Sequence, residues 1–206
     1  YWNGSSWTYS GGHYKDATVS PYWVRHKADP NSSYYVTAYE DNSKKIYAVG
    51  WSATGVLNGC VKITDDAIGD YRYHRPFDVV YSSGTDLNTT YLNGLSYIVY
   101  GDSGNLRYMP CNSSPGTFSC GGSSTIRNGG TSYYPYWVQA ERAADNTIHI
   151  AIHDTNDDLV MWTFAPNTWT YRGTVSTNLE HETNHVHEIF ALTPNRAAKA
   201  MTALSL

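Results

Sequence analysis

The chain alternates apolar and polar residues over short segments, a pattern typical of β-strands. Residues 147–153 show it most clearly, because single histidine or alanine residues separate Ile148, Ile150 and Ile152. Successive side chains of a strand point to opposite faces of a sheet. A period of two therefore predicts a strand with one apolar face and one more polar face.

Three long segments of the chain resemble one another. Each contains a strand that begins with proline, an alternating strand, a turn rich in Asp, Asn, Ser or Gly, and a second alternating strand. The first prolines are Pro21, Pro76 and Pro135, which lie 55 and 59 residues apart (76−21 and 135−76). The turn residues suit tight hairpins, and a proline at the start of a strand costs no ladder hydrogen bond. Four strands in a unit of roughly 50 residues predict the blade of a β-propeller.

The two ends of the chain read as halves of one further unit. Residues 1–16 match the outer half of the third segment, and residues 179–206 supply an inner half. We therefore expect an all-β chain in a single domain, a β-propeller of four-stranded blades with about four blade equivalents. Its expected parts are an outer half-blade (1–16), three blades (17–70, 71–130 and 131–178) and an inner half-blade (179–206). The termini either share one blade or belong to a piece of a larger propeller, and a β-sandwich is the alternative fold.

The composition favours a β-protein that contacts other molecules outside the cell. Aromatic residues make up 15% of the chain and charged residues only 16%. The net charge of −4 provides no basic surface for phosphates, so we expect no nucleic-acid partner. No segment approaches the about 20 apolar residues of a membrane span, so we expect no membrane insertion. Tyr1 in place of Met indicates a processed or trimmed start.

Cysteines and glycosylation signals indicate an oxidising compartment. Cys111 and Cys120 flank a turn-rich stretch and are predicted to form a hairpin disulfide, the alternative being three reduced thiols that include Cys60. Acceptor sites for N-glycosylation occur at Asn3, Asn31, Asn88 and Asn112. Together with the low charge, these features predict a secreted, extracellular protein.

In a propeller, the residues just before each innermost strand line one mouth of the central channel. Here these positions carry His, Tyr, Arg and Glu, which serve as general acids and bases, proton donors and anion-binding groups. The predicted catalytic residues are His74, Tyr134, His187 and Glu188. The predicted substrate-binding residues are Arg75, Tyr73, Tyr133, His13 and Tyr14. The alternative interpretation is that the tyrosines pack the rim and the histidines belong to solvated loops.

The hairpins at 98–108 and 150–162 resemble blades of the sialidase-like (BNR-repeat) propellers and of the fungal and bacterial propeller lectins. The resemblance implies a secreted propeller that recognises glycans. The full aspartate-box motif of sialidases is absent, and Asn3-Gly-Ser-Ser-Trp7 keeps only its end. His74-Arg-Pro76 is similar to the segment that carries a sialidase's first substrate arginine. The corresponding positions elsewhere are Ser20, Tyr134 and His187, so the sialidase arginine triad is not evident.

A carbohydrate-active enzyme with one central site is the function that we expect, with a multivalent lectin as the alternative. A lyase suits the His and Tyr residues better than a retaining hydrolase, which needs two carboxylates. Asp16, Asp78 and Glu188 are the acid candidates for hydrolysis. The lectin is favoured by recurring tryptophans, which either bind sugars between blades or pack. They are Trp2, Trp7, Trp51, Trp162 and Trp169. A structural, self-assembling extracellular module is a further alternative.

One motif indicates a different chemistry. The segment 181–185 spells H-E-x-x-H, in which two histidines on one helical face bind zinc and a glutamate activates water. A zinc peptidase is therefore another alternative. A divalent metal held by His181 and His185, alone or with His187, is the one cofactor that the sequence suggests, and a plain loop is the other interpretation. The Asp-rich turn 154–158 lacks the length and the distal Glu of an EF-hand calcium loop.

Overall fold

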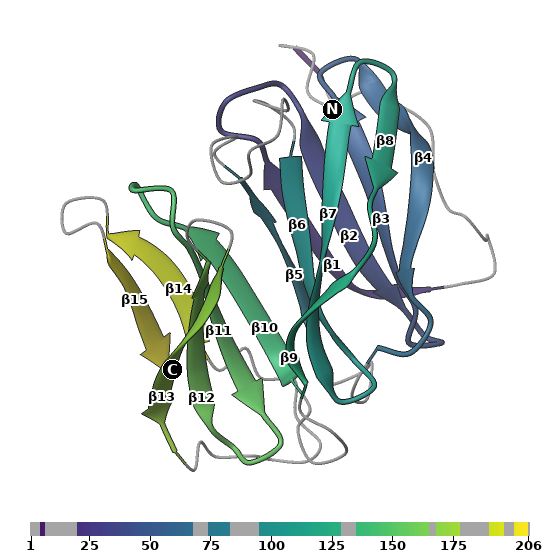
Figure 1. Ribbon diagram of the computed structural model, residues 1–206. Coiled ribbons are helices and arrows are strands. Elements are labelled where there is room, and N and C mark those ends of the chain that lie inside the picture. Colours follow the sequence, from purple (N-terminus) through teal and green to yellow (C-terminus); the bar gives the residue numbers. More distant parts are fainter. Residues whose placement is uncertain are drawn as a thin grey trace.

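The computed structural model describes residues 5–6, 20–67, 74–82, 95–128, 135–164, 168–177, 190–195 and 200–205, the last two ranges by their backbone. These residues form strands β1 to β15 and contain no helix, which confirms the prediction of an all-β chain. The strands follow one another as antiparallel meanders along the chain (Figure 1).

The first two meanders join into one nine-stranded sheet. Unit 1 consists of β1 (Pro21–Ala28), β2 (Tyr35–Asp41), β3 (Ile46–Ser52) and β4 (Gly55–Thr64). Unit 2 consists of β5 (Phe77–Tyr81), β6 (Leu95–Asp102), β7 (Asn105–Ser114), β8 (Thr117–Cys120) and β9 (Ser124–Asn128). Strand β9 pairs with the start of β7 and β8 with its end, so the two together form the outer strand of unit 2. A parallel bridge between Asn58 and Thr117 pairs β4 with β8, and an antiparallel bridge between Ala67 and Asp102 is a further connection between the two units.

The remaining strands form a separate sheet and a hairpin. Unit 3 consists of β10 (Pro135–Arg142), β11 (Ile148–Asp154), β12 (Leu159–Phe164) and β13 (Trp169–Ser176). The hairpin consists of β14 (Phe190–Asn195) and β15 (Ala200–Ser205), and β14 lies beside β10. The strands that the three repeated segments predicted are all present, which confirms the interpretation of period two as β-structure.

The same turn connects the second and third strands of units 1 and 3. Asp41 and Asp154 each close the turn by accepting a backbone hydrogen bond from the residue three positions later. That later residue, Lys44 or Asp157, has a positive φ of 61° or 59°. The carboxylates of Asp41 and Asp154 accept further backbone hydrogen bonds from the turn. Short polar side chains that bond to their own turn explain why these hairpins recur at the predicted positions.

Unit 2 is buried on both faces. One face, which includes Val79 and Ile98, packs against unit 1. The opposite face, which includes Val80 and Val99, packs against unit 3. Adjacent residues of one strand therefore belong to different cores, which explains why nearly every residue of β5 and β6 is buried, Asp78 and Ser96 included.

The first strands of units 1 and 3 come together even though unit 2 lies between the two sheets. Arg25 of β1 donates a hydrogen bond to Gln139 of β10 at 3.3 Å. The ring centroids of Trp23 and Trp137 are 5.3 Å apart. Packed sheets lie about 10 Å apart, so alternate sheets of a flat stack are separated by about 20 Å. Strands β1, β5 and β10 must therefore converge along one line.

The predicted disulfide is present and joins Cys111 of β7 to Cys120 of β8. Of the predicted glycosylation sites in the described ranges, Asn31 is exposed in a turn and Asn112 lies within β7. Asn3 and Asn88 lie outside those ranges. No helix with the length and apolarity of a membrane span occurs in the described part of the chain.

Candidate functional site

The sequence predicts a site formed by the residues that come before the converging strands in the chain. Two of the predicted residues lie in the described ranges. His74 and Arg75 immediately precede β5. The other predicted site residues lie outside the described ranges. They are His13, Tyr14, Tyr73, Tyr133, Tyr134, His181, His185, His187 and Glu188.

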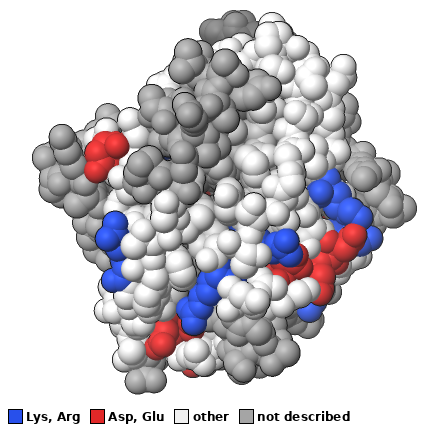
Figure 2. Space-filling view, in the orientation of Figure 1, with Lys and Arg blue, Asp and Glu red and all other residues white. Residues whose placement is uncertain are grey.

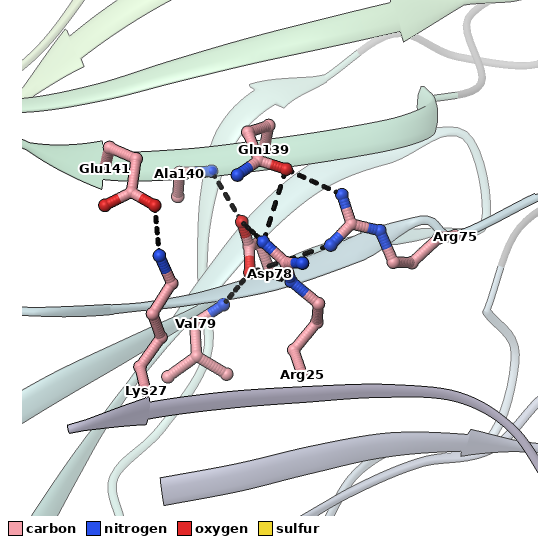
Figure 3. Close-up of polar contacts among 8 residues, drawn as sticks. All are labelled: Arg25, Lys27, Arg75, Asp78, Val79, Gln139, Ala140 and Glu141. Carbon is pink, nitrogen blue, oxygen red and sulfur yellow. Dashed lines mark hydrogen bonds and ion pairs between the residues drawn. The ribbon is translucent and has the colours of Figure 1, made fainter. Parts of the chain in front are cut away.

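Asp78 of β5 is the centre of a polar network between the converging strands (Figure 3). Its carboxylate is fully buried and accepts hydrogen bonds from Arg25 Nε at 2.8 Å and Arg25 Nη2 at 3.3 Å. It also accepts the backbone N–H groups of Val79 and Ala140, each at 2.8 Å. A carboxylate with this many donors is held in a fixed position. Asp78 therefore connects all three units.

Three members of this network occupy the same position of their strands. Arg25 pairs with Ala38, Asp78 with Val99, and Gln139 with Ala151. Each partner lies three residues before the aspartate that starts the next turn (41−38, 102−99 and 154−151). The repeat therefore carries an arginine, an aspartate and a glutamine at equivalent positions of the three strands. These side chains bond to one another where the strands converge.

Arg75 completes this inner-strand network, which we define as Arg25, Arg75, Asp78 and Gln139. Arg75 Nη2 donates to Gln139 Oε1 at 2.8 Å, and Nη1 lies 3.9 Å from Asp78 Oδ1. The guanidinium lies 4.7 Å from the centre of the Trp137 ring, in the geometry of a cation–π contact. With only 2% of its surface exposed, Arg75 holds the units together and offers little surface to a ligand.

A second charged pair lies further along the same strands. Lys27 of β1 forms an ion pair with Glu141 of β10, two residues beyond Arg25 and Gln139 respectively (Figure 3). Both side chains are partly exposed. Arg75, Asp78 and Gln139 of the inner-strand network are thus buried, whereas the side chains of Arg25, Lys27 and Glu141 are 24%, 25% and 23% exposed.

His74 belongs to a cluster of rings at the opposite end of these strands. Its ring stacks on Tyr136 of β10 with centroids 4.2 Å apart and planes 11° from parallel. Tyr136 in turn meets His153 edge to face at 6.4 Å. His153 is buried, and its Nε2 lies 3.4 Å from Asp157 Oδ1. We call His74, Tyr136 and His153 the histidine cluster. It places proton-transfer side chains beside the buried Arg75.

A larger aromatic group lies between β7 of unit 2 and the strands β12 and β13 of unit 3. We call it the outer aromatic cluster, and it comprises Tyr108, Trp162, Phe164, Trp169 and Tyr171. Trp169 contacts Phe164 at 4.6 Å and Tyr108 at 5.4 Å, and Trp162 contacts Tyr171 at 5.2 Å. The indole N–H groups of Trp162 and Trp169 are buried and have no hydrogen-bond partner within the described ranges. Buried indole N–H groups are usually bonded, so this cluster holds two unused donors.

Burial shifts the acidity of two side chains near these clusters. Burial raises the pKa of Asp154, the aspartate that starts the β11–β12 turn, while hydrogen bonds from the backbone N–H groups of Asn156 and Asp158 partly oppose the shift. Burial lowers the pKa of His149 in β11. The first shift favours a neutral carboxylic acid and the second a neutral imidazole.

On the face of the molecule that Figure 2 shows, the described basic and acidic residues form small groups with uncharged surface between them. In the ranges that the structure describes, no three His, Cys, Asp or Glu side chains are grouped to hold a metal ion. The H-E-x-x-H segment lies outside those ranges.

The sequence reasoning named Arg75 and Asp78 and missed Arg25, Gln139 and Glu141. A signal for them exists, because Trp23-Val-Arg25-His-Lys27 and Trp137-Val-Gln139-Ala-Glu141 both continue from a tryptophan with polar residues at every second position. A row of polar residues on one face of a first strand indicates that other strands provide hydrogen-bond or ion-pair partners for that face.

Searches of protein-family models, curated proteins and solved structures find no match to this chain.

Proposed function

We propose that this chain is a carbohydrate-binding module with the architecture of a β-propeller. The convergence of β1, β5 and β10 on Asp78 supports the architecture, because radial sheets meet at their innermost strands. A β-sandwich has two packed sheets and gives no reason for contacts between a first and a third sheet. The packing of β14 beside β10 agrees with a further radial unit.

The outer aromatic cluster is the site that we assign to sugar binding. Aromatic rings stack on the C–H faces of sugars. Tyr171 is 46% exposed, and Trp162 and Trp169 are half-buried beside it. The indole N–H groups of both tryptophans are buried, so the rings and not these donors would meet a sugar. The exposed ring of Tyr171, 5.2 Å from the ring of Trp162, is the observation that carries the proposal.

Binding fits the described residues better than glycoside cleavage. Hydrolysis uses two carboxyl groups that flank the scissile bond. Asp78, the described acid candidate, is buried under four hydrogen bonds, and Glu141 pairs with Lys27. Neither carboxylate is placed to exchange a proton with a substrate.

A secreted location agrees with the disulfide between Cys111 and Cys120, because such bonds persist in oxidising compartments. Asn31 is exposed in a turn between β1 and β2, where an N-linked glycan has room. We therefore propose that the module acts outside the cell.

Binding of glycans to this cluster is tested by calorimetry on ligands selected with a glycan array. Tyr171→Ala is expected to weaken binding by about tenfold to a hundredfold, which corresponds to about 1–3 kcal/mol of lost stacking and contact. Tyr22→Ala is the matched control, because Tyr22 of β1 is also 46% exposed but lies in unit 1. Equal loss in both variants, or an array without any signal, contradicts the proposal.

A lyase at the histidine cluster is the second candidate function. The stacking of His74 on Tyr136 puts two side chains that can remove and donate a proton next to each other, as elimination from an acidic polysaccharide requires. Tyr134, His187 and Glu188 remain the further predicted catalytic residues. Unsaturated products from a uronate polysaccharide that disappear in His74→Ala and persist in His149→Ala would support it. Unchanged turnover in His74→Ala would exclude it.

A further inference from the structure

Strand β13 contains an extra residue beside the outer aromatic cluster. Trp162 of β12 pairs with Tyr171. The preceding residue of β12, Met161, pairs with Gly173, two positions beyond Tyr171 (173−171). Arg172 is therefore the extra residue of a β-bulge. Gly173 has a positive φ of 116°, which residues with a side chain rarely adopt, so the glycine permits the bulge at this position.

The bulge brings the side chains of Tyr171 and Thr174 to the same face of the sheet. Residues three positions apart in a regular strand point to opposite faces. Here their partners in β12, Trp162 and Val160, are two positions apart and both pack toward unit 2. The hydroxyl oxygens of Tyr171 and Thr174 are 3.1 Å apart and form a hydrogen bond. The bulge therefore creates a pair of hydroxyl groups at the rim of the outer aromatic cluster.

The same bulge directs the charge of Arg172 away from this face. Arg172 Nε donates a hydrogen bond to Thr163 Oγ1 at 2.8 Å. Thr163 lies between Trp162 and Phe164 in β12, so its side chain points away from the face that carries those two rings. The hydroxyl pair therefore lacks the guanidinium of the residue next to Tyr171, which would favour an acidic sugar.

The hydroxyl pair is exposed and can form further hydrogen bonds. Tyr171 is 46% exposed, and Thr174 is exposed as well. A hydroxyl group is both a donor and an acceptor with two lone pairs. After the bond between Tyr171 and Thr174, the pair keeps a donor and several lone pairs for a ligand. Sugar hydroxyls have the same capacity to donate and accept, so they suit this pair.

We propose that Thr174 is a specificity-determining residue of the sugar site, and that its hydroxyl and that of Tyr171 bind adjacent hydroxyls of a neutral pyranose stacked on the Tyr171 ring. This role rests on the proposed function, because it requires the ring of Tyr171 to bind a sugar. Recognition depends on hydroxyl groups at the edge of the sugar, since the charge of Arg172 lies on the opposite face. The bond between Tyr171 and Thr174 orders both side chains before a sugar arrives, which lowers the entropy lost on binding.

Titrations of the isotope-labelled protein, followed by NMR, measure the role of Thr174. The probes are the methyl glycosides of glucose, galactose and mannose and those of the corresponding uronic acids. A neutral glycoside is expected to bind more tightly than its uronic acid counterpart. Thr174→Val is expected to raise its dissociation constant about threefold to tenfold, the effect of one lost hydrogen bond. Thr174→Ser keeps the hydroxyl and should remain within about twofold of the wild type.

Three results of these titrations overturn the proposal. They are the absence of binding by the neutral glycosides, tighter binding of the uronic acids, and equal affinities of Thr174→Val and the wild type.

Gly173→Ala tests the bulge, because alanine is strained at this positive φ, and is expected to raise the dissociation constant at least about threefold. Gly116→Ala is the matched control. Gly116 also has a positive φ, of 76°, but lies in the turn between β7 and β8. Nothing lies within 4 Å of the added Cβ at either position, so backbone strain is the shared effect. Thermal unfolding shows that both variants are folded at the temperature of the titration. Equal affinities of the two variants overturn the proposal.

Monodeoxy analogues of the bound glycoside separate a direct contact from a structural effect. In the wild type, removal of the sugar hydroxyl that meets Thr174 is expected to weaken binding about threefold to tenfold. In Thr174→Val the same removal should weaken binding less than about twofold, because that hydroxyl has already lost its partner. Equal losses in both proteins overturn the proposal.

Tyr171→Ala distinguishes failure of this inference from failure of the proposed function. If Tyr171→Ala loses binding while Thr174→Val binds as the wild type does, the sugar site stands and the role of Thr174 is overturned. If Tyr171→Ala binds as tightly as the wild type, the proposed sugar site is wrong, and the role of Thr174 fails with it.

Discussion

Lys27 of β1 forms an ion pair with Glu141 of β10, although the whole of unit 2 separates these strands in the sequence. Together with the contacts of Asp78, this pair locates the line on which the first strands of three units meet (Figure 3). A polar line between apolar sheets is costly unless its members satisfy one another. The repeat meets this condition, because its equivalent positions carry an arginine, an aspartate and a glutamine that bond to one another.

Asp78→Asn is expected to destabilise the protein by about 3–5 kcal/mol, because it removes the carboxylate that pairs with the buried Arg75 and the partly exposed Arg25. Urea denaturation followed by tryptophan fluorescence measures the change. Asp65→Asn is the control, since Asp65 forms an exposed ion pair with Lys62 and should change stability by less than about 1 kcal/mol. Similar losses in both variants would mean that Asp78 does not anchor the network.

Gly50→Ala is expected to destabilise the protein by about 1–3 kcal/mol through overpacking. A Cβ at Gly50 would lie 2.5 Å from Cδ2 of Phe118, a buried residue of the strand that the disulfide ties to β7. Gly122→Ala is the control, because nothing lies within 4 Å of its added Cβ. Thermal unfolding of both variants measures the difference. A Gly50→Ala protein as stable as the wild type would show that Phe118 does not pack where the structure places it.

The strands and turns were predictable because they depend on local chemistry. Alternation at 147–153 and the turn aspartates Asp41 and Asp154 specify strands and hairpins without reference to the rest of the chain. The partner of Asp78 was not predictable, because Arg25 lies 53 residues away and meets it only when the units pack. The disulfide was predictable because its cysteines lie nine residues apart across one hairpin. The tryptophans of the outer aromatic cluster stand out in the sequence because they recur. Which rings contact one another was not predictable, because it depends on the packing of unit 3 on unit 2.

Asp154 is expected to make stability fall as the pH rises. Because burial raises the pKa of Asp154 above its unfolded value, its contribution is fully present below the unfolded pKa and is lost as the pH rises through the folded pKa. Compared with Asp154→Asn, the wild type should therefore lose unfolding free energy between about pH 4 and neutrality.

Asp145 provides a control of opposite sign. A hydrogen bond from the backbone N–H of Thr147 lowers the pKa of Asp145, so its contribution is lost as the pH falls. Denaturation of the wild type, Asp154→Asn and Asp145→Asn from about pH 2 to neutrality measures both slopes, the Asp145 slope lying below about pH 4. If both carboxyl groups changed the free energy of unfolding in the same direction as the pH rises, the opposite pKa shifts assigned to them would be contradicted.

Removal of the disulfide through Cys111→Ser with Cys120→Ser is expected to cost about 2–3 kcal/mol, because the bond closes a short loop in the unfolded chain. Denaturation midpoints of the double variant and of the reduced wild type should agree. Cys60→Ala serves as the control for general effects of cysteine replacement. A wild type whose midpoint does not respond to reduction would contradict the presence of the bond in solution.

The convergence of β1 and β10 is tested most directly by cross-linking Lys27→Cys to Glu141→Cys, in a chain that also carries Cys60→Ala. A short bifunctional maleimide has less reach than the about 20 Å between alternate sheets of a flat stack. We predict rapid cross-linking within one chain, identified by mass spectrometry of the joined peptides. Two singly modified cysteines without a bridge would contradict the meeting of these strands, and with it the proposed radial arrangement.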